Sequence, residues 1–362
     1  MLSSCNGQPW RPVHALSIQE NRMNMAKLLF KSSASVCVLA ACAAIASAQY
    51  EGELTAKRRL FPEVGSGLRA IKRGDSDKTY ILSSQGLMVF DAKDRKLLTI
   101  GSPAADAPSK TTGPGGPAAG ASFAEDFDVD AAGQIYVADR AANLIAEYSA
   151  DGNRLKSFRV NAPLSVAALP DGEVAVATLH DPHLILVFDK NGRDIRDFGE
   201  LEEISSREDL NRYLNSGYLA TDARGNIYYA FIYTPEPTVR QYDRNGYALQ
   251  TIQFTEIEAF AAAQAARKEI ERQERKGKQP AFKPILTAIG VVRDSGGVWI
   301  ALHNRLLRFD KDGYRKATYQ LYTPDGTRLD ANSILVEKDR ILIGSDPLGI
   351  FEFERPDIKL GQ

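Results

Sequence analysis

The stretch DFDVDAAGQIYVADRAANLIAEYSADGNRLKSF, residues 126–158, contains four short runs in which apolar and polar residues alternate. Turns separate these runs: Gly133 precedes the second run, and the pair Asp151-Gly152 precedes the fourth. Alternation with a period of two is typical of half-buried β-strands. Asp-Gly between apolar runs favours a tight hairpin, because glycine supplies the positive φ that such a turn needs. The stretch therefore predicts four consecutive antiparallel strands.

The same pattern recurs along the chain. An aromatic residue ends the third run of each unit, an acidic residue mostly follows it, and a tight turn comes next. The occurrences are Phe90-Asp91, Tyr148, Phe188-Asp189, Tyr242-Asp243, Phe309-Asp310 and Phe353-Glu354. Repeated units of four short antiparallel strands are the signature of a β-propeller. We therefore predict an all-β fold: a six-bladed β-propeller of four-stranded antiparallel blades.

The last unit, residues 340–355, leaves little chain for an outer strand. The segment ELTAKRRLF, residues 53–61, lies near the other end of the repeated region. If it pairs with the last unit, the sheet loses an open edge and the ring closes. We expect this closure, and the alternative is that residues 53–61 form a loose arm.

Residues 113–158 resemble an NHL repeat, with a Gly/Pro-rich approach, a turn, the run IYVAD, an aromatic strand and Asp-Gly. The other units match this pattern more loosely. The resemblance is to six-bladed propeller proteins of the NHL type, here bacterial and exported, whose usual role is to present a binding face. The repeat carries no catalytic residue, so the resemblance implies an architecture rather than a chemistry.

Residues 25–48 have the pattern of a secretory signal peptide. Lys27 and Lys31 form the positive region, an apolar stretch follows, and Ala46-Ser47-Ala48 is a small-residue cleavage site. Residues 1–24 precede this pattern, and we interpret them as an over-extended start or a leader. The mature chain is then a single propeller domain of residues 49–362 without a transmembrane helix.

The run Leu39-Ala40-Ala41-Cys42 lies within the same segment and resembles a bacterial lipobox. In that alternative Cys42 is lipidated and becomes the mature N-terminus. We therefore predict an exported protein in the periplasm or outside the cell, with an outer-membrane lipoprotein as the alternative.

Composition excludes several classes of function. Lys and Arg number 45 against 46 Asp and Glu, so the formal net charge is −1, which argues against a nucleic-acid partner. All three cysteines (Cys5, Cys37 and Cys42) precede residue 49. The predicted mature domain therefore has no disulfide, no cysteine nucleophile and no thiolate zinc site.

Three long connections join blades: residues 102–122, 200–216 and 256–284. Because strands alternate in direction, these connections share one face, and the tight glycine turns share the other. The longest contains a predicted helix at about 255–277, between blades 4 and 5. A capping box, Thr255 to Glu258, begins it. Its apolar stripe is Ala259, Phe260, Ala263, Ala266 and Ile270. The helix is expected to act as a lid on this face, or alternatively to dock a partner.

The candidate ligand-binding residues all follow second strands and should therefore lie on the face of the long connections. They are Asp139, His180, Asp181, His183, His303 and Asp346. Histidine and carboxylate groups that converge near a propeller mouth can bind a divalent metal. This arrangement resembles, in outline, propeller lyases that cleave peptidyl-hydroxyglycine. A metal site of His180, His183 and His303 is accordingly the weaker alternative.

We predict a non-catalytic binding or scaffold module for a protein, peptide or glycan, which acts through the face of the long connections. No cofactor is expected. The alternative is a metal-dependent lyase or hydrolase of the propeller type that uses the clustered histidine and aspartate residues and a divalent metal.

Overall fold

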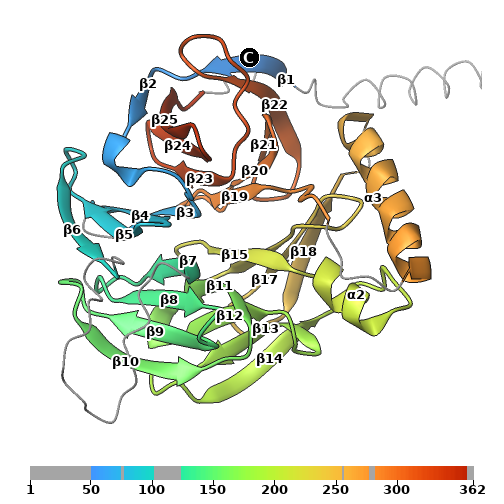
Figure 1. Ribbon diagram of the computed structural model, residues 1–362, viewed down its shortest axis with the longest axis horizontal. Helices are drawn as coiled ribbons and strands as arrows, with labels where there is room; N and C mark the ends of the chain where they lie inside the picture. Colours follow the sequence, from blue (N-terminus) through green and yellow to red (C-terminus); the bar gives the residue numbers. More distant parts are fainter. Residues whose placement is uncertain (1–49, 75–76, 102–123, 255–256, 277–281, 357–362) are drawn as a thin grey trace, which may run out of the picture. The chain divides into compact units, whose positions relative to one another are not determined.

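The computed structural model describes residues 50–74, 77–101, 124–254, 257–276 and 282–356 (Figure 1). The strands form six sheets that succeed one another along the chain and around a ring. Within each sheet, strands consecutive in sequence are antiparallel neighbours. The predicted six-bladed propeller of four-stranded antiparallel blades is confirmed. No described helix is long and apolar enough to cross a membrane.

The first three blades each consist of four consecutive strands. Blade 1 is β3 (Ala70–Arg73), β4 (Thr79–Ser83), β5 (Gly86–Phe90) and β6 (Lys96–Ile100). Blade 2 is β7 (Ala124–Val129), β8 (Ile135–Asp139), β9 (Leu144–Tyr148) and β10 (Arg154–Arg159). Blade 3 is β11 (Pro163–Ala168), β12 (Val174–Thr178), β13 (His183–Phe188) and β14 (Asp194–Glu200), with a 3-10 turn η3 (Pro170–Gly172) after β11.

Blade 4 repeats this order, whereas blades 5 and 6 also take strands from the N-terminal side. Blade 4 is β15 (Gly217–Thr221), β16 (Ile227–Phe231), β17 (Thr238–Tyr242) and β18 (Ala248–Gln253). Blade 5 is β19 (Ala288–Val291), β20 (Val298–Leu302), β21 (Arg305–Phe309) and β22 (Arg315–Tyr322), extended by β1 (Tyr50–Thr55). Blade 6 is β23 (Ser333–Val336), β24 (Arg340–Ser345), β25 (Gly349–Glu354) and β2 (Arg58–Leu60).

Strand direction defines two faces. The connections from first to second strand and from third to fourth strand lie at one face, which we call the turn face. The loops from second to third strand and the connections between blades lie at the other, which we call the insertion face. The first strands of neighbouring blades (β3, β7, β11, β15, β19 and β23) contact one another around the centre of the ring.

The acidic residue after the repeated aromatic forms the hairpin turn. Oδ1 of Asp189 accepts hydrogen bonds from the backbone N–H groups of Asn191, at 2.8 Å, and Arg193, at 2.9 Å. Gly192 in this turn has φ 75°, and a Cβ there would lie 2.6 Å from Cβ of Phe158 on blade 2. The turn therefore needs glycine both for its backbone conformation and for its contact with the preceding blade.

The repeated aromatic residues also hold neighbouring blades together. Phe188 on β13 lies 5.0 Å, between ring centroids, from Phe158 on the outer strand of blade 2. Tyr242 on β17 lies 5.2 Å from Phe198 on the outer strand of blade 3. Aromatic pairs at such separations contribute about 0.5–1.5 kcal/mol beyond area burial. The pattern that reveals the repeat in the sequence is thus the pattern of the blade interfaces.

The ring closes through two N-terminal strands rather than one. β2 pairs antiparallel with β25, with Arg58 opposite Glu352, and supplies the outer strand of blade 6 as expected. The prediction that residues 53–61 form this strand is correct only for its C-terminal part. Residues 53–55 belong instead to β1 (Tyr50–Thr55), which pairs in parallel with β22 of blade 5. A short 3-10 turn η1 (Pro62–Val64) then leads toward blade 1.

A set of polar contacts joins blade 6 to blade 1, and we call it the closure seam. The backbone N–H of Ile71 donates to Oγ of Ser333 at 2.8 Å. The Glu337 carboxylate, only 15% exposed, accepts hydrogen bonds from the guanidinium groups of Arg73 on blade 1 and Arg340 on its own blade. These bonds connect the last blade to the first beside the central axis.

Two connections on the insertion face contain helices. α3 (Ile257–Lys276) lies between blades 4 and 5, which confirms the predicted helix within one or two residues. Ala263 and Ile270 of its apolar stripe are buried. Thr255 of the expected capping box and the side chains of Glu258, Ala259 and Phe260 lie outside the described residues, as do residues 102–122. α2 (Glu208–Leu214), between blades 3 and 4, was not predicted, because its seven residues show no clear helical period.

Candidate functional site

The sequence-predicted site residues lie at the insertion-face ends of their blades, as strand direction requires, but the structure does not gather them into one group. They are distributed as Asp139 on blade 2, His180, Asp181 and His183 on blade 3, His303 on blade 5 and Asp346 on blade 6. The six residues come from four blades and therefore form no single compact cluster, and ligand binding by any of them stays a prediction.

Several of these residues make contacts that shape loops. Oδ1 of buried Asp139 accepts a 2.9 Å hydrogen bond from the backbone N–H of Ala142 and so forms the turn between β8 and β9. The backbone N–H of His303 donates to Oγ1 of Thr287 at 3.2 Å, and its carbonyl oxygen accepts from the N–H of Ala331. His303 has φ 55°, a conformation that suits a tight loop.

Blade 3 contains one group with metal-ligating chemistry. Nδ1 of His183 lies 2.9 Å from Oδ2 of Asp197 and 3.9 Å from Oδ1 of Asp181. Among the described residues this is the group whose three donor atoms all fall within 4.8 Å of one another. Neither His180 nor His303 belongs to it, so the predicted three-histidine set is not assembled.

The donor set of the blade 3 group fits a divalent metal only in part. It offers one imidazole and two carboxylates, and Asp197 is exposed on the outer strand β14. Burial raises the pKa of nearby Asp194, and the charges of Asp197 and Asp181 raise it further. Negative charge is therefore concentrated here, at the outer edge of the blade rather than at the centre of the ring.

The two helical insertions pack against each other. Leu210 and Leu214 of α2 form a small apolar cluster with Ile270 of α3. Oε1 of Glu274 accepts hydrogen bonds from Oγ of Ser205, at 2.7 Å, and from the loop that precedes α2. The described part of α3 is therefore anchored to α2, and its role as a lid or as a docking helix stays a prediction.

This packing creates a group of aromatic side chains, which we call the aromatic patch: Tyr213, Tyr218, Tyr233 and Phe282. The ring of Tyr213 on α2 stacks on Tyr233 of the β16–β17 loop, with centroids 4.8 Å apart, and lies 6.1 Å from Phe282. Burial raises the pKa of Tyr233, and Tyr213, hydrogen-bonded to it, and Tyr218 raise it further. All four residues remain partly exposed.

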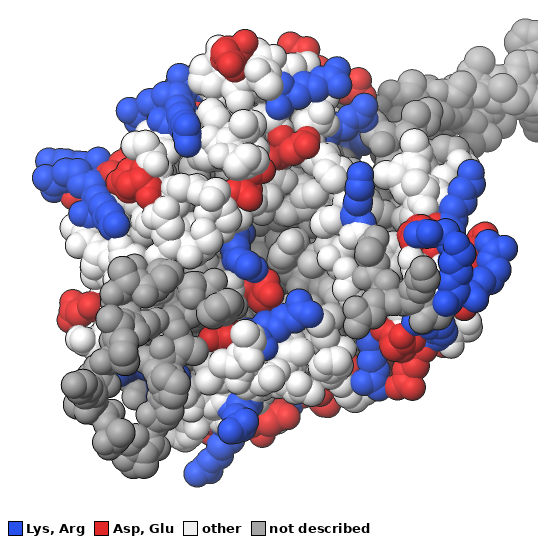
Figure 2. Space-filling view, viewed as in Figure 1, with Lys and Arg blue, Asp and Glu red and all other residues white. Residues whose placement is uncertain are grey.

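Charged groups adjoin the aromatic patch. The Glu125 carboxylate at the start of β7 pairs with the guanidinium groups of Arg69, at 2.5 Å, and Arg140, at 3.7 Å. Arg69 and Glu125 line the same central cavity as Tyr218 of the patch, so these charges lie near it. Figure 2 shows basic and acidic side chains next to one another beside a hollow near the centre of the view. Aromatic and arginine side chains therefore occur together on the insertion face.

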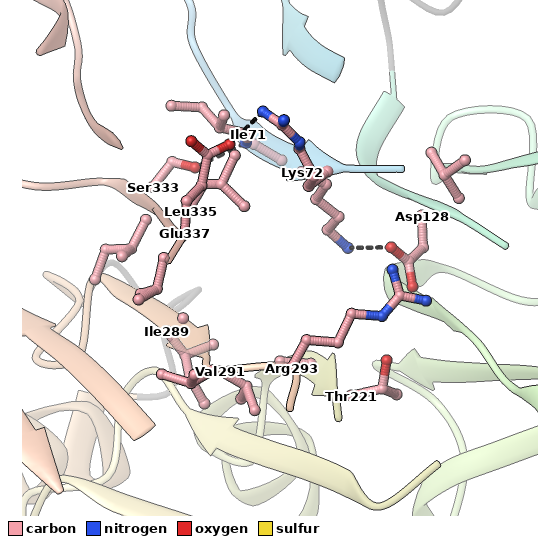
Figure 3. A pocket seen from close by; sticks show the side chains of 18 of the residues that line it. Ile71, Lys72, Asp128, Thr221, Ile289, Val291, Arg293, Ser333, Leu335 and Glu337 are labelled. Carbon is pink, nitrogen blue, oxygen red and sulfur yellow. Dashed lines mark hydrogen bonds and ion pairs between the residues drawn. The ribbon is translucent and has the colours of Figure 1, made fainter. Parts of the chain in front are cut away.

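A cavity of about 1080 Å³ occupies the centre of the ring. Its lining comes from the first strands of all six blades (Figure 3). Tyr218 of the aromatic patch lines it, together with Arg69 and Glu125. None of the sequence-predicted site residues is among the lining residues. This central cavity is therefore a feature that the sequence did not reveal.

One wall of the cavity carries paired charges. Nζ of Lys72 on β3 lies 3.2 Å from Oδ1 of Asp126 and 3.8 Å from Oδ1 of Asp128, both on β7. Burial disfavours the charged amine, but the two carboxylates outweigh it and raise the pKa of Lys72. Burial also raises the pKa of Asp128, although Lys72 opposes that shift. The ammonium group therefore stays charged between two carboxylates.

Asp126 and Asp128 differ in how completely their carboxylates are satisfied. Asp126 accepts hydrogen bonds from Oγ of Ser165, at 2.5 Å, and from the N–H of Val166 and Nζ of Lys72. Asp128 accepts one at 2.8 Å from the N–H of Ala168, while Lys72 stays 3.8 Å away. Asp126 thus links β3, β7 and β11, whereas Asp128 keeps accepting capacity toward the cavity.

The opposite wall is apolar. Ile289 and Val291 on β19 and Leu335 on β23 are partly exposed and line the cavity (Figure 3). Arg293, which follows β19, reaches into the cavity between this wall and Asp128 in the same view. A ligand in the cavity would therefore meet apolar groups on one side and ionised groups on the other.

Lys72 and Asp128 were not predicted from the sequence, because the predicted site residues were sought only in the loops that follow second strands. A signal was present: the first strand of blade 2, AEDFDV, carries acidic residues at alternating positions in a strand that a propeller places at its centre. The aromatic patch gave a weaker signal, because its members come from separate connections and meet only through the packing of α2 and α3.

Comparison with known proteins shows the fold alone. The sequence matches no family model and no curated protein sequence. The WD40 repeats of RRP9 share 12% identity at a TM-score of 0.51, over 83% of this chain and 99% of that one. A protein of unknown function from Bacteroides thetaiotaomicron shares 12% identity at a TM-score of 0.51, over 85% and 75%.

Virginiamycin B lyase from Staphylococcus aureus, solved with quinupristin, is also similar. It shares 12% identity at a TM-score of 0.48, over 84% of this chain and 90% of that one. At this TM-score the likeness carries no argument about activity, and the propeller fold alone does not specify one.

Proposed function

We propose that this protein is an exported, non-catalytic binding module that takes a protein or peptide through its insertion face. The observation that carries the proposal is the aromatic patch, which two insertions assemble beside the cavity and the Arg69–Glu125–Arg140 charges. Tyrosine and arginine dominate the energetics of protein interfaces. The NHL-type resemblance of residues 113–158 supports the same role, because such propellers present a binding face.

The test is a matched pair of tyrosine variants. Tyr213→Leu removes the ring that stacks on Tyr233, whereas Tyr247→Leu removes a 73% exposed tyrosine from a tight turn on the turn face. Immobilised mature domain is incubated with the native envelope fraction, and captured molecules are identified. We expect Tyr213→Leu to lose the partner and Tyr247→Leu to keep it, with both variants folded by circular dichroism.

The opposite pattern, in which binding survives Tyr213→Leu and fails with Tyr247→Leu, would place the binding face on the turn side. A captured glycan instead of a polypeptide would keep the face but correct the ligand class, because tyrosine rings also stack on sugars.

A metal-dependent lyase or hydrolase is the second candidate, and the Asp181–His183–Asp197 group favours it. Metal content of purified mature domain distinguishes the two. A stoichiometric divalent ion that disappears in His183→Ala would support the enzyme. Absence of metal, with no stability gain on adding zinc, would support the binding module.

A further inference from the structure

We infer that the central cavity is a separate binding site for a small molecule with an apolar body and a cationic amine, the amine lying against Asp128. This inference does not depend on the proposed partner of the insertion face. The residues that carry it belong to β7, β19 and β23, which lie at the centre of the ring.

The charge of the lining favours a cation. Ten acidic and eight basic residues line the cavity, so carboxylates are in excess. Close to Asp128, Lys72 is shared between two carboxylates and lies 3.8 Å from Asp128, and Arg293 is the other cation drawn there (Figure 3). An ammonium group on a ligand could donate to Asp128 the charge-assisted hydrogen bond that Lys72 does not make at this distance.

The hydrogen bonds single out Asp128 rather than Asp126. Ser165, Val166 and Lys72 already occupy the Asp126 carboxylate. Oδ2 of Asp128 accepts from Ala168, and its Oδ1 faces Lys72 at 3.8 Å, beyond hydrogen-bond distance. Asp128 is also 18% exposed, against 8% for Asp126, so a ligand can reach it.

The apolar wall defines the rest of the ligand. Ile289, Val291 and Leu335 are partly exposed and line the cavity, although each also packs against an apolar cluster of the blades. Ligand pockets typically combine such a wall with a few placed polar groups, within volumes of roughly 300–1,000 Å³. The cavity, at about 1080 Å³, is large enough for a whole small molecule.

The experiment uses three probes with one apolar body and different head groups: hexylamine, hexanol and hexanoate. Their affinities for the mature domain are measured by calorimetry at pH 7. We expect hexylamine to bind at least tenfold more tightly than hexanol, and hexanoate to bind more weakly than either. Preferred binding of hexanoate would assign the cavity to anions held by Arg293, and absence of binding by all three would also overturn the inference.

Two variants locate the amine. Asp128→Asn keeps an acceptor for Ala168 but removes the charge, and it should abolish the tenfold preference of hexylamine over hexanol. Asp294→Asn is the matched control, because Asp294 is an exposed carboxylate at the rim of the same cavity. It should leave the preference intact. A preference that survives Asp128→Asn would remove Asp128 from the site.

A measurement on the unaltered protein tests the same site without relying on a variant that could fail to fold. In methyl-labelled protein, hexylamine should shift the resonances of Ile289, Val291 and Leu335 and leave those of the exposed Leu97 and Leu249 in place. Shifts confined to the exposed leucines would show binding at the outside of the ring and contradict the inference.

Discussion

The carboxylate of Asp346 accepts a 2.7 Å hydrogen bond from the backbone N–H of Gly67. Asp346 follows the second strand of blade 6, and Gly67 lies in the segment that leads into blade 1. The bond therefore crosses the same junction as the closure seam, at the insertion-face end. Asp346, which the sequence predicts as a ligand-binding residue, thus forms a structural contact with Gly67.

Replacing Asp346 by alanine should lower the free energy of unfolding by about 1 kcal/mol, because one hydrogen bond to a charged acceptor is lost at an exposed position. Urea unfolding measures the change. Binding of the partner captured by the insertion face should not change, and a stable variant that loses that partner would instead restore Asp346 as a contact residue.

The N-terminal strands allow a graded test of ring closure. Deleting residues 49–62 removes both β1 and β2, exposes the edge of blade 6, and should cost several kcal/mol in unfolding free energy. Deleting residues 49–55 removes β1 alone and should cost much less, because blade 5 keeps four strands. Thermal melting compares the two. Equal melting temperatures for the longer deletion and the full domain would show that β2 is not needed.

Two glycines with similar backbone conformations separate strain from steric conflict. Gly192→Ala places a Cβ 2.6 Å from Phe158 at φ 75°, and should cost about 2–4 kcal/mol. Gly326→Ala has φ 83° but no atom within 4 Å of the new Cβ, and should cost about 1 kcal/mol. Urea unfolding of both variants gives the difference. Equal costs would mean that the contact with Phe158 does not constrain the turn.

Acid should weaken the turn of blade 1. Hydrogen bonds from the Arg95 side chain and backbone lower the pKa of Asp91 to about 2, from a reference of 3.8. A carboxyl group whose pKa is lower in the folded protein than in the unfolded chain stabilises the fold at pH values above its pKa in the unfolded chain. This contribution is lost as the pH falls through 4 toward 2. The stability difference between the unaltered protein and Asp91→Asn should therefore be present at pH 7 and shrink by pH 2.

Ser149 supplies the control for this pH dependence. It holds the equivalent position in blade 2, where its Oγ accepts from the N–H of Asn153 at 3.2 Å and cannot ionise. The effect of Ser149→Ala on unfolding should be the same at both pH values. A parallel pH dependence for the two variants would assign the acid sensitivity to other groups.

Export can be tested by intact mass. Cleavage after Ala48 should leave Gln49 as the N-terminus of protein recovered from the envelope, whereas processing at the lipobox should leave a lipidated Cys42. Unprocessed protein found only in the cytoplasm would contradict both alternatives.

The number and order of the blades were predictable because each blade repeats the same local rules. Asp189 and Gly192 specify a hairpin turn whatever surrounds them, and Phe188 fills an interface that recurs between blades. Helix α3 was also predictable, since its apolar stripe extends over several turns. These features depend on residues close together in sequence.

The candidate sites depend on residues far apart in sequence. Tyr213 meets Tyr233 only because α2 packs on α3, and no local pattern encodes that contact. Lys72 and Asp128 belong to different blades and meet because both lie on innermost strands. The parallel placement of β1 on β22 likewise joins the two ends of the chain, and the periodicity of either segment does not specify it.

The position of β1 and β2 has a consequence for how the protein is made. A ribosome produces these strands first, yet their partners lie at residues 315–322 and 349–354, almost at the end of the chain. Blades 1 to 4 consist of consecutive strands, but the ring cannot close before residues 349–354 have been synthesised. The two earliest strands must wait unpaired through nearly the whole of translation. The junction between the first and the last blade consequently stays open until the last blade has been synthesised.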